Sequence, residues 1–153
     1  GRPQSHLGLR FGAVATVGTQ TSPYAGGGVA GLSLNGLAPM LGIEYELGID
    51  LYTLTGEDVA VETQVRAVRI DLLFGLADET SASEFYVAAG PRLLLARSNV
   101  YWGIADEVLV AGGISGGIRQ PGGEGWDARL TYDSVVDSTN IQGLLGFYCS
   151  WRF

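Results

Sequence analysis

The last thirteen residues of the chain alternate between apolar and more polar side chains and stop on an aromatic residue. Because successive side chains of a β-strand point to opposite faces, a period of two predicts a strand with one apolar face. The ends of soluble proteins are usually polar and frayed, so an apolar terminal strand indicates apolar surroundings. The apolar face consists of Ile141, Gly143, Leu145, Phe147, Cys149, Trp151 and Phe153.

The same period of two recurs along the whole chain, and it is clearest in residues 41–51. Six large apolar residues share one face there, while three carboxylates and two glycines occupy the other. Turn-forming pairs such as Asn35-Gly36 separate the alternating segments. The pattern predicts eight strands, at residues 6–18, 26–34, 40–53, 61–75, 84–97, 106–118, 125–134 and 141–153.

Composition narrows the class of protein. Hydrophobic residues make up 46% of the chain and charged residues only 16%, against roughly a quarter in soluble domains. No run of about 18 apolar residues could form a transmembrane helix. We expect a single domain over residues 1–153, with residues 1–5 as an N-terminal extension. The net charge of −7 argues against a nucleic-acid partner, and no metal-ligand spacing or cofactor motif is present.

Two closed eight-stranded architectures fit this pattern. A soluble lipocalin-like barrel has an apolar, ligand-holding interior, whereas an outer-membrane barrel is apolar outside and polar inside. An eight-stranded interior is narrow, and the polar face here is rich in glycine while the apolar face carries large side chains. Small residues therefore suit the inside, which favours the membrane barrel and leaves the lipocalin-like barrel as the alternative.

The closing segment, residues 147–153, resembles the last strand of the small eight-stranded outer-membrane barrels of the OmpA/OmpX type. The resemblance covers the whole chain as a pattern, and it implies an all-β, antiparallel, up-and-down transmembrane barrel. Both sets of loops look short in this sequence, whereas the family usually has long extracellular loops. It further implies a location in the outer membrane of a Gram-negative bacterium, a periplasmic C-terminus, and outer-membrane lipids as partners. With that polarity, five outward-facing rings form a periplasmic aromatic girdle: Phe74, Phe85, Trp126, Trp151 and Phe153.

Charged residues fall on the face that this architecture turns inward. Buried charges must pair, so the sequence predicts an interior filled by an ion-pair network. Its members are predicted to be Glu44, Glu46, Asp50, Arg69, Asp71, Arg92, Asp127 and Arg129, and the same face carries Arg10, Glu107, Arg119, Asp133 and Arg152.

These patterns favour a structural role over a chemical one. We expect a membrane-embedded scaffold or an accessory subunit that contacts other envelope proteins, and we predict no catalytic residue. A narrow pore through the charged interior is one alternative. A lipid-modifying enzyme that uses Ser115 and His6 is another, although the G-x-S-x-G match at residues 113–117 lacks the strand–turn–helix context of a nucleophile elbow. The G-x-G-x-x-G match at residues 26–31 lacks a helix after it.

Overall fold

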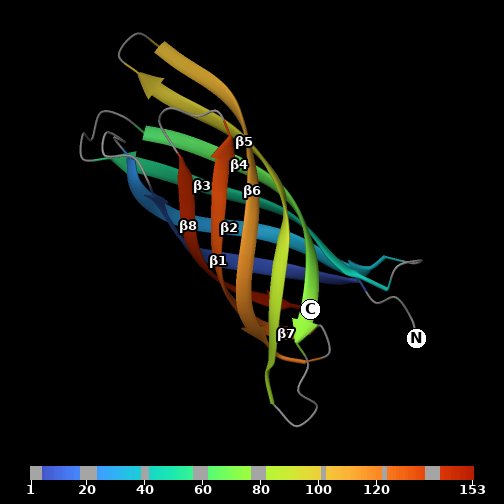
Figure 1. Ribbon diagram of the computed structural model, residues 1–153. Coiled ribbons are helices and arrows are strands. Elements are labelled where there is room, and N and C mark those ends of the chain that lie inside the picture. Colours follow the sequence, from blue (N-terminus) through green and yellow to red (C-terminus); the bar gives the residue numbers. More distant parts are fainter. Residues whose placement is uncertain are drawn as a thin grey trace.

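The computed structural model describes residues 5–17, 24–38, 42–56, 62–76, 82–100, 103–121, 124–136 and 142–153. They form one antiparallel sheet in which each strand pairs with the next and β1 pairs with β8, so that the sheet closes into a barrel (Figure 1). Residues 1–4, Ile141 and most of the predicted turns lie outside the described residues. The strands are β1 (His6–Val17), β2 (Tyr24–Leu37), β3 (Glu44–Gly56), β4 (Glu62–Leu76), β5 (Glu84–Val100), β6 (Gly103–Arg119), β7 (Gly125–Val136) and β8 (Gly143–Arg152).

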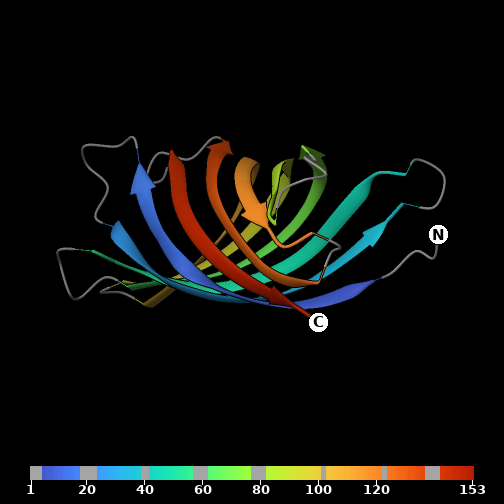
Figure 2. The same ribbon diagram turned by 90° about the horizontal axis from the view of Figure 1, so that it is seen from below.

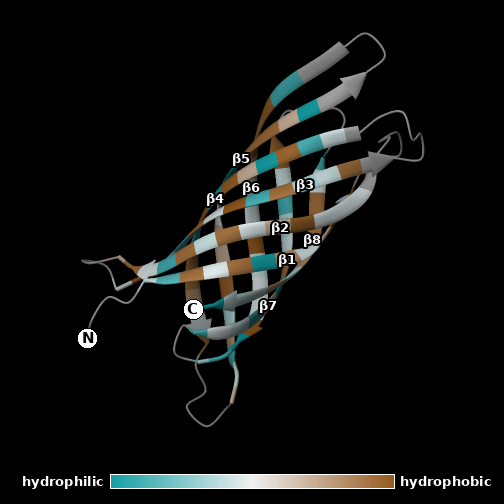
Figure 3. Cartoon of the chain, turned by 180° about the vertical axis from the view of Figure 1, so that it is seen from behind, coloured by the Kyte–Doolittle hydropathy of each residue, from teal (hydrophilic) through white to brown (hydrophobic). Residues whose placement is uncertain are grey.

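Side chains alternate between an exposed exterior and a buried interior along every strand. In β1 the outward residues Leu7, Leu9 and Phe11 are exposed, and the intervening Arg10 is buried. Figure 3 shows the resulting bands of hydropathy along the strands. The period of two in the sequence therefore predicted both the strands and the outward position of the apolar face, and the fold class is confirmed. Among the residues that the structure describes, no helix is long and apolar enough to cross a membrane.

Four strands are longer than their sequence pattern predicted, and β2, β5 and β6 differ most. The glycine-rich β2 spans Tyr24–Leu37 because β1 and β3 pair with it on both sides, and this pairing outweighs the low strand propensity of glycine. The prediction of a turn at Asn35-Gly36 was therefore wrong. Strands β5 and β6 pair up to Val100 and Gly103, whereas β7 joins β6 only from Val110 onward. The β5–β6 hairpin consequently reaches beyond the end of β7 (Figure 1).

Strand β1 begins and strand β8 ends at the same end of the barrel, here called the terminal end (Figure 2). The opposite end is called the far end. The Phe153 amide donates a hydrogen bond of 2.8 Å to the Leu7 carbonyl. His6 Nδ1 lies 3.1 Å from the Phe153 carbonyl oxygen. The ladder between β1 and β8 runs from Gly8↔Arg152 to Val17↔Gly143, so the barrel closes over the length of the final strand.

The outward face forms a continuous apolar belt around the barrel. The belt covers about ten positions of each strand, the length that a tilted strand needs to cross a bilayer. The five rings of the predicted girdle all point outward near the terminal end, and Trp126 lies directly opposite Trp151 on the adjacent strand. Their role at a membrane interface remains a prediction. The exposed apolar residues of β6 are Val108, Val110, Ile114 and Ile118.

Candidate functional site

The interior of the barrel holds an ion-pair network, here called the interior network. It consists of six arginines and seven carboxylates contributed by strands on all sides of the barrel. Each of these side chains occupies an inward position of its strand because charged residues alternate with apolar ones in the sequence. The members are Arg10, Glu44, Glu46, Asp50, Arg69, Asp71, Glu84, Arg92, Arg119, Asp127, Arg129, Asp133 and Arg152.

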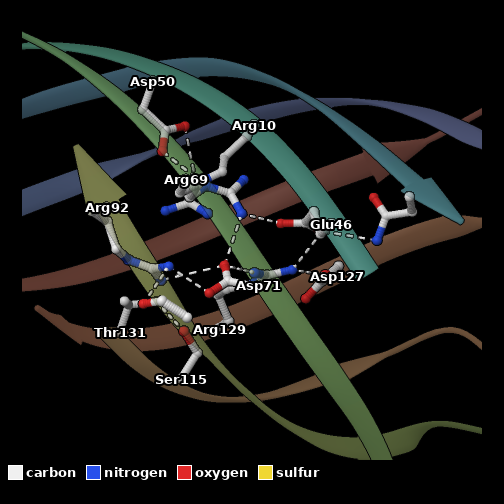
Figure 4. A network of polar contacts seen from close by, with 12 residues as sticks. Arg10, Glu46, Asp50, Arg69, Asp71, Arg92, Ser115, Asp127, Arg129 and Thr131 are labelled. Atoms are coloured by element: carbon white, nitrogen blue, oxygen red, sulfur yellow. Dashed lines mark hydrogen bonds and ion pairs between the residues drawn. The ribbon is translucent and has the colours of Figure 1, made fainter. Parts of the chain in front are cut away.

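Glu46 on β3 is the centre of the interior network (Figure 4). It is 1% exposed and forms an ion pair with Arg69 on the neighbouring strand. Arg129 and Arg152 reach it across the barrel, at 3.0 and 3.1 Å. Asn35 donates a further hydrogen bond of 2.9 Å to it. One carboxylate therefore joins β2, β3, β4, β7 and β8.

Asp127 on β7 is a second shared carboxylate. It lies 3.0 Å from Arg129 and 2.7 Å from Arg152, so the same two guanidinium groups bridge Glu46 and Asp127. Tyr86 donates a hydrogen bond of 2.5 Å to the other carboxylate oxygen. Groups that share partners in this way lock the positions of one another, because moving one would leave several buried charges unpaired.

Asp71 on β4 connects this centre to the charges nearer the far end. It contacts Arg69 at 3.1 Å and Arg92 at 2.5 Å. Arg92 also contacts Asp133 at 2.8 Å, and Arg69 contacts Asp50 at 3.0 Å. These contacts extend the interior network from its centre toward the far end.

Arg10 and Tyr148 form the boundary of the charged region. The Arg10 guanidinium lies 3.5 Å from the centroid of the Tyr148 ring and 3.5 Å from an Asp50 oxygen. A cation over an aromatic face is attracted by the ring quadrupole, so Tyr148 joins a charged layer to an apolar one. Toward the terminal end, Arg119 pairs with Glu44 and Glu84 at the mouth of the barrel.

The far half of the interior is filled by apolar side chains, here called the apolar plug. Leu54, Leu94 and Leu144 are its largest fully buried members, and Leu54 is 0% exposed. The packed cluster consists of Val14, Val29, Tyr52, Leu54, Val65, Ala67, Leu94, Ala96, Leu109, Ala111, Val135, Leu144 and Tyr148. The sequence predicted an interior of paired charges only, so the structure corrects that prediction for the far half of the barrel.

The two halves of the interior differ in their unpartnered polar atoms. Eight buried side-chain polar atoms in the described part of the chain have no hydrogen-bond partner within the protein, and they belong to the charged residues and Asn35. Buried polar gaps of this kind hold water in proteins, whereas small apolar spaces stay dry. A continuous aqueous path between the two ends would have to pass the packed side chains of the apolar plug.

Glycines at inward positions leave room for the charged side chains, because they have no Cβ atom. A Cβ atom on Gly48 would lie 2.5 Å from Cζ of Arg69. A Cβ atom on Gly113 would overlap the side chains of Arg92 and Asp133. These contacts explain why the polar face of the sequence is rich in glycine, as an eight-stranded interior has little room.

The structure brings all eight predicted network residues to the interior: Glu44, Glu46, Asp50, Arg69, Asp71, Arg92, Asp127 and Arg129. Glu107 is different, because it lies on the part of β6 that extends past the end of β7, and it is exposed. Sequence reasoning missed the role of Tyr86 and the whole apolar plug. The available signal was three consecutive apolar residues, as at 93–95 and 108–110, where neither face of the strand is polar.

The residues considered for enzymatic chemistry lie apart. Ser115 is in the middle of β6 and shares a hydrogen bond of 2.8 Å with Thr131, whereas His6 is at the terminal end beside Phe153. Residues 26–31 are part of β2. Within the described ranges, no group of three or more His, Cys, Asp or Glu side chains could hold a metal ion.

Comparisons with known proteins agree with the fold. No protein-family model matches the sequence, and no curated protein sequence matches it. Several solved structures are similar to this chain in fold. Neisserial surface protein A is 14% identical, with a TM-score of 0.65 over 97% of this chain and 96% of that one.

Two further solved structures are similar. The N-terminal β-barrel domain of Pseudomonas aeruginosa OprF is 16% identical, with a TM-score of 0.59 over 99% of this chain and 100% of that one. A major outer membrane protein from Thermus thermophilus is 16% identical, with a TM-score of 0.55 over 98% and 100%. Identities this low show the fold alone: the chain has the fold of eight-stranded outer-membrane β-barrels. The outer-membrane setting of that fold agrees with the apolar belt and with the predicted location.

Proposed function

We propose that this chain is a sealed, non-enzymatic barrel that serves the outer membrane as a structural scaffold or as an accessory subunit of a larger envelope assembly. The observation that carries the proposal is the division of the interior into one half of shared ion pairs and one half filled by apolar side chains. A transport pore needs a continuous polar path, and an enzyme needs reacting groups within hydrogen-bond reach of one another.

The exterior supports the same proposal. The apolar belt provides a surface for lipid or for another membrane protein, and the charged interior holds the barrel rigid. Ser115 and His6 lie on different parts of the barrel, so the described residues provide no Ser–His pair at the site that the sequence had suggested. A rigid barrel without an aqueous path or a reactive pair of side chains is suited to a structural role in the membrane.

Single-channel recording in planar lipid bilayers tests this proposal. We expect the purified protein to insert without producing current steps, because the apolar plug blocks water and ions. The double variant Leu94→Ala/Leu144→Ala truncates two of the largest plug residues and is expected to produce openings. Each truncation costs about 2–5 kcal/mol of stability, so folding is checked by circular dichroism before recording.

The matched control is Leu73→Ala. Leu73 is equally buried and belongs to the small apolar cluster with Tyr86 and Ala88, outside the apolar plug. It is expected to lose similar stability and to stay closed. Current steps from the unmodified protein would contradict the sealed barrel and favour the pore.

A further inference from the structure

Two arginines point outward in the described part of the chain, and both lie at the far end. Arg66 lies one outward position beyond the belt residue Val68 on β4, opposite Leu51 and Leu95 on the adjacent strands. Arg97 lies one outward position beyond Leu95 on β5. Both side chains are exposed. They therefore stand at the edge of the apolar belt, at the level where a bilayer passes from hydrocarbon to headgroups.

The charge of Arg97 is already satisfied. Its Nε and Nη2 atoms donate hydrogen bonds to the two oxygens of Asp106 on β6, at 2.8 and 3.4 Å. The hydrogen bond from Arg97 holds the pKa of the Asp106 carboxyl below its usual range. No hydrogen bond or ion pair within the described residues involves the guanidinium of Arg66, so Arg66 is the outward cation that is free to bind an anion.

An apolar groove begins directly beside Arg66. It has a volume of about 590 Å³ and crosses the outward face of β1 to β4, between Phe11, Ala30 and Leu51. Gly28 opens it, since a Cβ atom there would meet only the Gly12 carbonyl oxygen, at 3.9 Å. Thr53, Gln64 and Arg66 also line it, so polar side chains join the mainly apolar lining next to the guanidinium.

We propose that Arg66 and this groove bind one anionic membrane lipid, with a lipid phosphate on the guanidinium and an acyl chain in the groove. Guanidinium groups match phosphate geometry with two parallel hydrogen bonds. The acyl chain fills apolar space that a flat strand surface would not offer. The inference rests on the membrane setting of the proposed function, and it adds a lipid site to it.

A second groove on the same belt separates the contribution of the acyl chain from that of the headgroup. It has a volume of about 600 Å³ around Gly116 and is lined by residues without any charge. A groove of this kind can take an acyl chain but cannot select a headgroup. Charge complementarity therefore distinguishes the groove beside Arg66 as the site for an anionic lipid.

Native mass spectrometry of the protein in detergent, with added phosphatidylglycerol or phosphatidylcholine, tests the proposal. We expect one phosphatidylglycerol to be retained in preference to phosphatidylcholine. Arg66→Gln is expected to weaken phosphatidylglycerol binding about fivefold, the loss typical of one surface cation facing an anionic lipid. The control Arg97→Gln/Asp106→Asn removes both charges of the neighbouring pair and is expected to leave binding unchanged.

A second pair of variants tests the groove. Gly28→Leu fills the groove beside Arg66, and Gly116→Leu fills the uncharged one; a Cβ atom at position 116 would meet nothing within 4 Å. We expect only Gly28→Leu to lower phosphatidylglycerol binding. Equal binding by the Arg66→Gln variant and the unmodified protein, or equal loss in the charge-pair control, would overturn the lipid site. If the protein shows no current steps in planar bilayers and no lipid preference, the lipid site is overturned and the proposed function stands. Current steps would contradict the proposed function whatever the lipid result.

Discussion

Replacement of Glu46 by alanine is expected to lower the free energy of unfolding by about 3–5 kcal/mol, the cost of removing one partner from a buried charge cluster. Glu46 contacts Arg69, Arg129 and Arg152, and each of these guanidinium groups is buried. Without the carboxylate, each of these three buried guanidinium groups would lose one of its carboxylate partners. Urea unfolding in detergent micelles, followed by tryptophan fluorescence, measures the change.

Two variants show whether this loss comes from the network. Glu124→Ala removes a carboxylate whose side chain is 70% exposed at the terminal end, and its effect is expected to stay within about 0.5 kcal/mol. Glu46→Gln keeps the shape and part of the hydrogen bonding, so an intermediate loss is expected. If Glu46→Ala were no more destabilising than Glu124→Ala, the interior network would contribute nothing to stability.

Replacement of Ile114 by arginine is expected to destabilise the barrel in lipid by about 2–4 kcal/mol, the cost of a charged side chain on the lipid face near the bilayer centre. Ile114 is 65% exposed and lies midway along the apolar belt of β6, between Gly112 and Gly116. In a soluble protein the same exposed position would tolerate a charge. Urea unfolding of the protein folded into phosphatidylcholine vesicles measures the difference.

The control for this prediction is Ala82→Arg. Ala82 is exposed just before β5, outside the apolar belt, and a charge there should change stability by less than about 1 kcal/mol. Equal tolerance of arginine at both positions would mean that the apolar belt faces water, and it would contradict a barrel that spans a membrane.

The sequence predicted the strands and their faces because a period of two carries both. Alternation along residues 41–51 and 141–153 fixes which side chains share a face, and bulky outward residues against inward glycines indicate which face is inside. The lengths of β2 and of the β5–β6 hairpin could not be predicted in the same way. They depend on pairing with neighbouring strands, which the pattern within one strand does not reveal.

The partners within the interior network could not be predicted either. Arg129 and Glu46 are 83 positions apart on strands that are not neighbours, so their contact depends on the stagger of the strands and the width of the closed barrel. The apolar plug was missed because its residues alternate with belt residues that are also apolar. Leu94 lies between Leu93 and Leu95, and only this run of three apolar residues indicates that the strand has no polar face there.

The environment of Cys149 in a lipid bilayer tests the central claim most directly. Cys149 is the only cysteine of the chain, and it is exposed on the outward face of β8 between Phe147 and Trp151. A nitroxide label can therefore be attached without any substitution. In vesicles, we expect strong relaxation of the label by oxygen and weak relaxation by a water-soluble nickel complex, as for a site in contact with acyl chains. Strong relaxation by the nickel complex, or a protein that stays in solution without entering the vesicles, would contradict a barrel whose apolar belt faces lipid.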